Sequence, residues 1–289
     1  MPDTDPVDPW CATTARERGV ALRATASRVE RWLLVEHAAA WGPESVPSGR
    51  MPAAAATAVA RAAQAAGARL LLVRRSSGGG SDGRWVFAVD SRPGRERVLA
   101  RHVDDDAALL DLVPPYGPGV PDGWAVHGER LHLVCTHGSH DRCCATRGRP
   151  VALAVSAAYG DAAWECSHIG GERFAANLLV LPEGHYFGHV EPDDAVAAIA
   201  ALGRGELDLA HWRGRSSLPT PVQAAQSFAG GGELLAQTTL EPDVWEVRLT
   251  GARVVVRYDR AGEDGAQLLT CGALEPKRAP VFRLVALDR

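Results

Sequence analysis

The sequence lacks long hydrophobic runs and has no strong excess of one charge. No stretch of about 18 apolar residues, the minimum for a membrane-spanning helix, occurs in the 289 residues. The 31 Lys and Arg residues nearly balance the 35 Asp and Glu residues, which leaves a net charge of −4 at pH 7. The average field therefore attracts neither nucleic acid nor an anionic membrane, and we expect no binding to either.

The sequence also lacks the marks of a secreted protein. Its first residues, MPDTDPVDPW, are acidic and proline-rich, whereas a signal peptide needs a basic start and an apolar run. The six cysteines are too sparse for the disulfide framework of a small secreted domain. We therefore expect a cytoplasmic protein. Cys11 and Cys271 are interpreted as structural or incidental, since free cysteine often behaves as a small buried hydrophobe.

Helix and strand patterns alternate in the first part of the chain, which predicts an α/β unit. The Ala-rich run 52–66 favours a helix that ends at Gly67. The Gly/Ser/Asp segment 76–83 predicts a turn that joins the strands on either side of it into a hairpin. The remaining expected elements of this unit are strands at 31–41, 69–75 and 84–91 and a helix at 104–112.

The segment 113–124 is rich in proline and glycine, which oppose both helix and sheet, and it predicts a linker. A second α/β unit follows, whose order of strands and helices is that of a thioredoxin-like layer sandwich. After it, strand patterns at 244–250 and 253–259 predict a small β-rich tail. The expected division is an N-terminal α/β domain at 1–124, a thioredoxin-like domain at 125–205 and a C-terminal helix and β-rich tail at 206–289. Within the second domain we expect strands at 130–135 and 163–166, a helix closing at Gly160, two strands within 177–190 and a helix at 193–202.

Metal-ligand residue types are concentrated in the second unit. Four of the six cysteines lie in CTHGSHDRCC (135–144) and in the segment that begins with Cys166. Eight residues separate Cys135 from Cys144, enough for a loop around a metal cluster, and Cys166 and His168 supply further donors. If the strands that end at Cys135 and Cys166 are parallel, their carboxyl ends meet at one edge of the sheet. Thiolate and imidazole donors in this pattern predict a metal or iron–sulfur site.

The same residues resemble the sucrase/ferredoxin-like family. CTHGSHDRCC followed by CSHIGGERFAANLLVLPEGHYFG (166–188) is similar to the family's motif, and RWLLVEH (31–37) and RGRSSLPTPVQAA (213–225) extend the likeness over most of the chain. The family motif is a cysteine, eight residues, a cysteine, and then His-x-Gly-Gly-His, whose residues form a Cys2His2 site. The resemblance implies a thioredoxin-like fold, a [2Fe–2S] cluster, and Cys135, Cys144 and His168 as ligands.

The fourth ligand position departs from the family motif, because Glu172 stands where the second histidine would be. A carboxylate binds iron but is a harder ligand than imidazole. Cys166 is a softer alternative, since alternate residues of a strand point to one face and Cys166 lies two residues from His168. An open or labile position is the third alternative.

Other residues near these motifs have predicted supporting roles. His137 is interpreted as a hydrogen-bond donor to a cluster sulfur, and Gly170 and Gly171 as positions of close backbone approach. Cys143, next to a ligand, should point elsewhere. Asp141 and Arg142 either fix the ligand loop through ion pairs or are solvated. Arg213 and Arg215 either bind an anionic partner or belong to a solvated loop.

Three function classes fit these residues. The first is a [2Fe–2S] electron carrier that works with an unidentified redox partner protein, in which histidine ligation raises the potential above that of four thiolates. The second is a thioredoxin-like thiol oxidoreductase, although the sequence has no Cys-x-x-Cys at a helix start. The third is a structural zinc-binding module, which would use the same donors. No catalytic residues are predicted, and an electron-transfer protein is favoured over a stand-alone enzyme.

Overall fold

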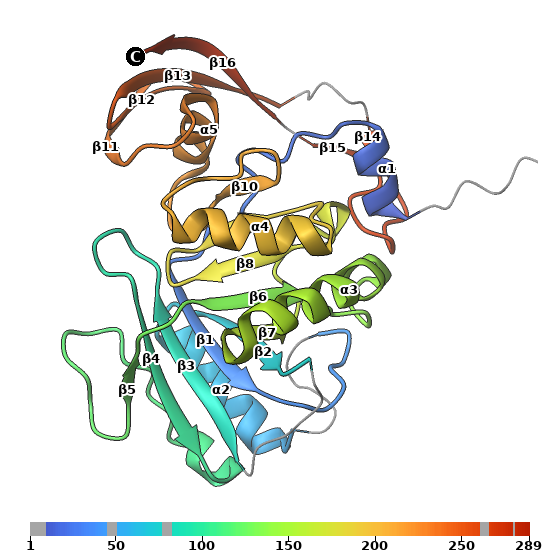
Figure 1. Cartoon of the computed structure of the whole chain (residues 1–289), viewed down its shortest axis with the longest axis vertical. Helices are drawn as coiled ribbons and strands as arrows, with labels where there is room; N and C mark the ends of the chain where they lie inside the picture. The colour runs from blue at the N-terminus through green and yellow to red at the C-terminus, as the bar shows by residue number, and fades with distance from the viewer. Residues whose placement is uncertain (1–9, 45–50, 77–82, 261–265, 280) are drawn as a thin grey trace, which may run out of the picture.

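The computed structural model describes residues 10–44, 51–76, 83–260, 266–279 and 281–289. Its main feature is a curled ten-stranded sheet with the strand order β10-β9-β8-β6-β7-β2-β1-β3-β4-β5 (Figure 1). The strands of this sheet are β1 (Arg31–Glu36), β2 (Arg69–Arg74), β3 (Arg84–Asp90), β4 (Arg97–Val103), β5 (Ala125–His127), β6 (Leu131–Cys135), β7 (Ala163–Cys166), β8 (Leu178–Leu181), β9 (His185–Phe187) and β10 (Trp212–Arg215). The helices are α1 (Cys11–Glu17), α2 (Ala53–Ala65), α3 (Arg142–Tyr159), α4 (Pro192–Gly203) and α5 (Thr220–Ala229), with short 3-10 turns η1 (Asp106–Leu109), η2 (Gly160–Ala162) and η3 (Glu172–Phe174).

A second sheet forms the C-terminal part of the molecule and packs against α5 (Figure 1). It contains β11 (Leu234–Glu241), β12 (Val244–Leu249), β13 (Ala252–Asp259) and β16 (Val281–Asp288). A two-stranded ribbon of β14 (Ala266–Gln267) and β15 (Lys277–Arg278) lies beside α1. The predicted α/β class with a β-rich C-terminal tail is confirmed; the thioredoxin-like description of its layers stays a prediction.

Alternation along the strands divides the main sheet into two apolar faces. On one face, Trp32 and Leu34 of β1 share a core with Leu133 and Cys135 of β6. On the other face, α2 covers β1 to β3, whereas α3 and α4 cover β6 and β8. Because neighbouring residues of β6 serve different cores, the strand is buried throughout and holds its last residue, Cys135, rigidly.

The strands at 31–36 and 69–74 and the helix at 53–65 agree with expectation, but the predicted hairpin is wrong. β2 pairs in parallel with β1, and β1 separates it from β3, which pairs antiparallel with the other edge of β1. The turn expected at 76–83 falls mostly on residues outside the described part of the chain. The helix expected at 104–112 is only the 3-10 turn η1.

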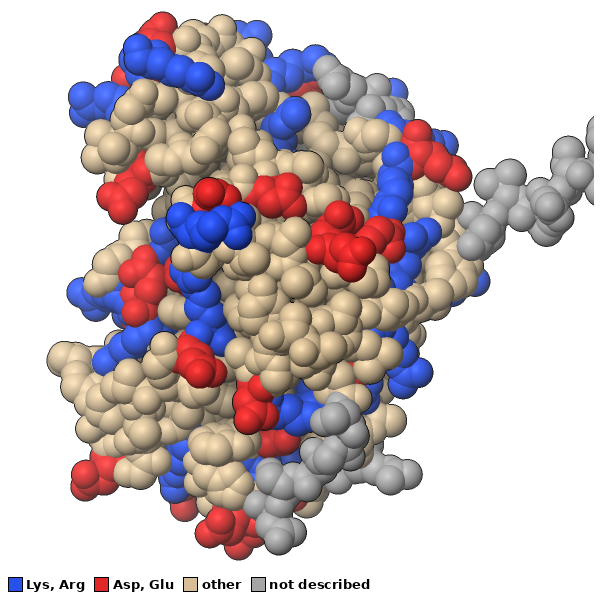
Figure 2. Space-filling view, viewed as in Figure 1, with Lys and Arg blue, Asp and Glu red and all other residues tan. Residues whose placement is uncertain are grey.

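The main sheet joins strands from both sides of the 113–124 segment, since β2 pairs with β7. The division of the chain into domains at this segment stays a prediction. Figure 2 shows acidic and basic side chains interspersed over one face of the molecule, in keeping with the nearly balanced composition. Among the described residues, no helix is long and apolar enough to cross a membrane.

Candidate metal centre

The centre lies where two parallel strands end. β6 and β7 are parallel, which meets the condition for their carboxyl ends to lie together, and Cys135 is in register with Cys166. After Cys135 the chain turns into α3, whose first turn is capped by Asp141: its Oδ1 accepts a hydrogen bond from the Cys143 amide at 2.8 Å. The helix start therefore returns Cys144 to the end of β6.

Three of the predicted residues converge at this edge. The ligand atoms of Cys135, Cys144 and His168 all lie within 4.8 Å of one another. Both cysteines are 1% exposed, and the His168 side chain is 15% exposed. Among the described residues, His168 Nδ1 is buried without a hydrogen-bond partner. Because a buried polar atom normally has a partner, this nitrogen is chemically suited to bind a ligand.

The two cysteines share one hydrogen bond and differ in acidity. The bond donated by Cys144, with smaller contributions from His168 and from the backbone amide of His137, lowers the pKa of Cys135 well below its ordinary value against the effect of burial. The pKa of Cys144 is raised because its thiol donates that bond and because it is buried. A bound cation would favour the deprotonated form of both cysteines, because the thiolate is the form that binds metal.

Glu172 lies beside a histidine that the sequence reasoning missed. Glu172 Oε1 is 3.5 Å from His168 Nε2 and 3.4 Å from His140 Nε2. The rings of His140 and His168 stack with their centroids 3.9 Å apart. His140 Nδ1 lies 3.1 Å from the Pro43 carbonyl oxygen, and the Nδ1–H tautomer that donates to this oxygen leaves a lone pair on Nε2. His140 is thus a further candidate for the fourth position.

Cys166 lies at the same sheet edge but outside these groups. Among the described residues, the clusters of ligand atoms within 4.8 Å of one another do not include its sulfur. Burial and the neighbouring charge of Cys135 raise the pKa of the Cys166 thiol, which favours the neutral form. Both facts favour Glu172 or His140 over Cys166 as the fourth donor.

The ligand loop is held against the segment that follows β1. His137 Nε2 donates to the Gly42 carbonyl at 2.7 Å, and Ser139 Oγ donates to the Trp41 carbonyl at 2.7 Å. His137 Nδ1 accepts the His168 amide at 3.1 Å. Both ring nitrogens of His137 therefore bind backbone, and it is the His137 backbone amide that donates to the Cys135 sulfur.

The His168 loop is held by a buried arginine. Arg213 is 1% exposed, and it donates to the Gly170 carbonyl at 2.9 Å and to Asn177 Oδ1 at 2.7 Å. Burial lowers its pKa to about 10. The solvated-loop prediction is therefore wrong, because both arginines lie in β10: Arg213 is a core residue that positions the His168 loop, and Arg215 pairs with Glu96.

Gly171 shows why the paired glycines are needed. Its φ is +81°, and a Cβ added there would clash with the Arg213 guanidinium. We expect Gly171→Ala to lower the free energy of unfolding by about 1–3 kcal/mol, since backbone strain and the clash act together. Thermal unfolding and iron content measure the effect. Gly203→Ala is the control, because nothing lies within 4 Å of the added methyl group; equal unfolding temperatures for the two variants would contradict the role of the Gly171 contact.

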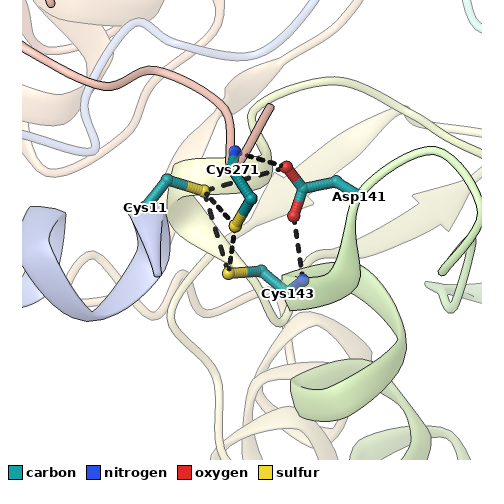
Figure 3. Close-up of side chains that lie close together, drawn as sticks. All are labelled: Cys11, Asp141, Cys143 and Cys271. Carbon is teal, nitrogen blue, oxygen red and sulfur yellow. Dashed lines mark hydrogen bonds between the residues drawn. The ribbon is translucent and has the colours of Figure 1, made fainter. Parts of the chain in front are cut away.

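The remaining cysteines form a second group. Cys143 points away from Cys144, as predicted, and its sulfur meets those of Cys11 and Cys271 beside Asp141 (Figure 3). Asp141 is buried and binds the backbone amides of Cys143 and Cys271. Asp141 is therefore not solvated, and it acts through hydrogen bonds to backbone amides rather than through an ion pair alone. The sequence carried no signal for this group, since Cys11 and Cys271 are 260 positions apart. His140, in contrast, could have been found from the sequence, because it stands within the ligand loop.

The fold and the site together define an α/β protein with candidate cysteine–histidine metal centres. A family model described as sucrase/ferredoxin-like matches residues 22–214. The chain belongs to the sucrase/ferredoxin-like family. Comparisons with curated proteins and with solved structures gave no match. Cys135, Cys144, His168 and Glu172 lie within the matched residues, whereas Cys11 and Cys271 lie outside them.

Proposed function

We propose that this protein is a [2Fe–2S] redox protein that carries single electrons to or from a partner protein. The observation that carries the proposal is the convergence of Cys135, Cys144 and His168 at the end of two parallel strands. Thiolate and imidazole together are the donors of mixed-ligand [2Fe–2S] centres. When bound, the cluster supplies a reversible one-electron couple.

The residues present fit such a group. Cys135 and Cys144 offer two buried thiols close together, and His168 offers a buried nitrogen with no other partner. Glu172 and His140 form a second group with His168, so that His168 belongs to both groups. The combined set has two buried thiols and an exposed histidine, His140.

The chain's own side chains keep this arrangement rigid. Thr136 Oγ1 donates to Glu165 Oε2 at 2.8 Å, and Arg74 binds the same oxygen at 2.7 Å, which fixes the loop directly after Cys135. Arg213 fixes the loop that carries His168. Rigid ligands lower the reorganisation that accompanies a change of charge, and hydrogen bonds to a thiolate tune its donor strength.

The surface above the histidines is the proposed place of electron exchange. His140 is exposed, whereas Cys135 and Cys144 are buried. A partner that docks over His140 would approach the histidine end of the centre. The partner is proposed to be a redox protein.

Anaerobically purified protein should test the proposal directly. We expect iron and acid-labile sulfide in equal amounts, visible absorption, and an electron paramagnetic resonance signal on reduction. Histidine ligation should raise the midpoint potential above the value of about −400 mV that is typical of plant-type four-thiolate ferredoxins. Iron without sulfide, or zinc alone in the group of Cys135, Cys144 and His168, would replace the proposal with a mononuclear or structural site.

A further inference from the structure

Three cysteines that come from distant parts of the chain meet at one point outside the candidate cluster site. Cys11 begins α1, Cys143 lies in the first turn of α3, and Cys271 lies in the segment between β14 and β15 (Figure 3). Their sulfur atoms are 3.8 Å apart for Cys11 and Cys143, 3.2 Å for Cys143 and Cys271, and 3.5 Å for Cys271 and Cys11. Asp141 Oδ2 is 4.0 Å from Cys11 Sγ.

We propose that Cys11, Cys143, Cys271 and Asp141 form a second metal site that binds a thiophilic divalent cation, with Zn²⁺ as the best fit. Zinc–sulfur bonds of about 2.3 Å at tetrahedral angles place two sulfur ligands about 3.8 Å apart. The observed separations of 3.2 to 3.8 Å approach this value. Three thiolates and one carboxylate complete a four-coordinate site, and binding releases the thiol protons to solvent.

Ordinary packing explains this cluster poorly. Cys11 and Cys143 are 1% and 0% exposed, so their thiols are withdrawn from water. In the segment that carries Cys271, Leu274 is 97% exposed while the cysteine is turned inward. A segment that followed the hydrophobic effect alone would bury the leucine first. The cysteine is turned inward instead, which indicates that its sulfur, rather than its apolar surface, determines how this segment packs.

The sulfurs are also not joined as a disulfide. All six cysteines are free, and the shortest of the three distances, 3.2 Å, exceeds the length of about 2.05 Å of an S–S bond. Asp141 Oδ2 is held toward the sulfurs because it accepts the Cys271 amide at 2.8 Å.

The site would act as a clamp between the ends of the described chain. It ties α1 and the β14–β15 segment to the start of α3. The adjacent residues Cys143 and Cys144 would then belong to different sites, and the first turn of α3 would connect the second metal site to the candidate cluster. Cys11 and Cys271 lie outside the residues that match the family model, and the second site shares no ligand with the first.

Metal analysis of crossed variants of the full chain tests the site. Protein expressed with iron and zinc in the medium and purified anaerobically should hold about one zinc ion per chain. Cys11→Ser/Cys271→Ser should lose the zinc and keep its iron and sulfide, whereas Cys135→Ser/Cys144→Ser should lose the iron and keep the zinc. Cys166→Ala, a buried cysteine outside both groups, is the matched control and should keep the zinc. Zinc that is absent from the wild type, or that survives in Cys11→Ser/Cys271→Ser, overturns the proposal.

A second measurement does not depend on the folding of any variant. In the folded wild-type protein, alkylation followed by mass spectrometry should show the partly exposed Cys271 protected while zinc is bound, and a zinc chelator should make it reactive. Equal alkylation of Cys271 with and without zinc, or a disulfide between any two of Cys11, Cys143 and Cys271 in the untreated protein, would refute a metal clamp. Failure of this test leaves the cluster proposal standing, because Cys135 and Cys144 are followed separately by iron and sulfide.

Discussion

Cys135→Ser and Cys144→Ser are each expected to abolish cluster assembly. The two sulfurs and His168 form one compact group, and a serine hydroxyl is far too weak an acid to replace a thiolate. Iron and sulfide in the purified variants should fall to the background of the assay. Visible absorbance should be lost in parallel, while circular dichroism reports whether the fold survives.

Cys143→Ser is the sharpest control for Cys144→Ser. The two cysteines are neighbours in the first turn of α3, yet the Cys143 sulfur faces Cys11 and Cys271. We expect Cys143→Ser to retain iron and sulfide. Wild-type iron content in Cys144→Ser, or equal loss in both variants without unfolding, would contradict the assignment of these two side chains to different sites.

Variants of the candidate fourth ligands should differ in the lifetime of the cluster in air, in a defined order. We expect His140→Ala to shorten the lifetime of the cluster in air most strongly, since its Nε2 lies 3.4 Å from Glu172 Oε1 and its ring stacks on that of His168. Glu172→Gln should shorten it by roughly 10- to 100-fold, the usual effect of removing a partner that orients a ligand. Cys166→Ala should stay close to wild type.

The order of these lifetimes distinguishes the alternatives. If Glu172→Gln has the larger effect, the carboxylate is the ligand and His140 orients it. Collapse of the cluster in Cys166→Ala would assign the buried thiol instead. Glu172→His then serves as a gain-of-function test: a longer lifetime than wild type supports Glu172 at the position of the family's second histidine.

A single helix start organises both groups of ligands. Asp141 caps α3, and the helical rotation that follows directs Cys143 and Cys144 about 100° apart, as the 3.6-residue turn requires. Disturbance of the cap should therefore affect both groups together. Asp141→Asn keeps the hydrogen-bond acceptor for the Cys143 amide but removes the charge, so it should weaken zinc binding more than iron content.

Local pattern was enough to predict the elements that deliver the main donors. Buried β-branched and leucine-rich runs specify β6 and β8, and the strand at 163–166 lies where the sequence predicted it. The sequence also allowed Cys135, Cys144 and His168 to be identified as candidates, because these residues lie within or directly beyond regular elements. The parallel pairing of β6 with β7 was only a condition of that prediction, and the structure supplies it.

Other features depended on contacts between residues far apart in the chain. The sequence alone determined an α/β protein of the sucrase/ferredoxin-like type with a cysteine–histidine motif at a sheet edge. Only the tertiary structure decided that Arg213 is buried against the His168 loop, and that Cys11 and Cys271 join Cys143. The physical reason is that periodicity reports which face of an element is buried, whereas the partner met on that face depends on how the complete chain closes around its cores.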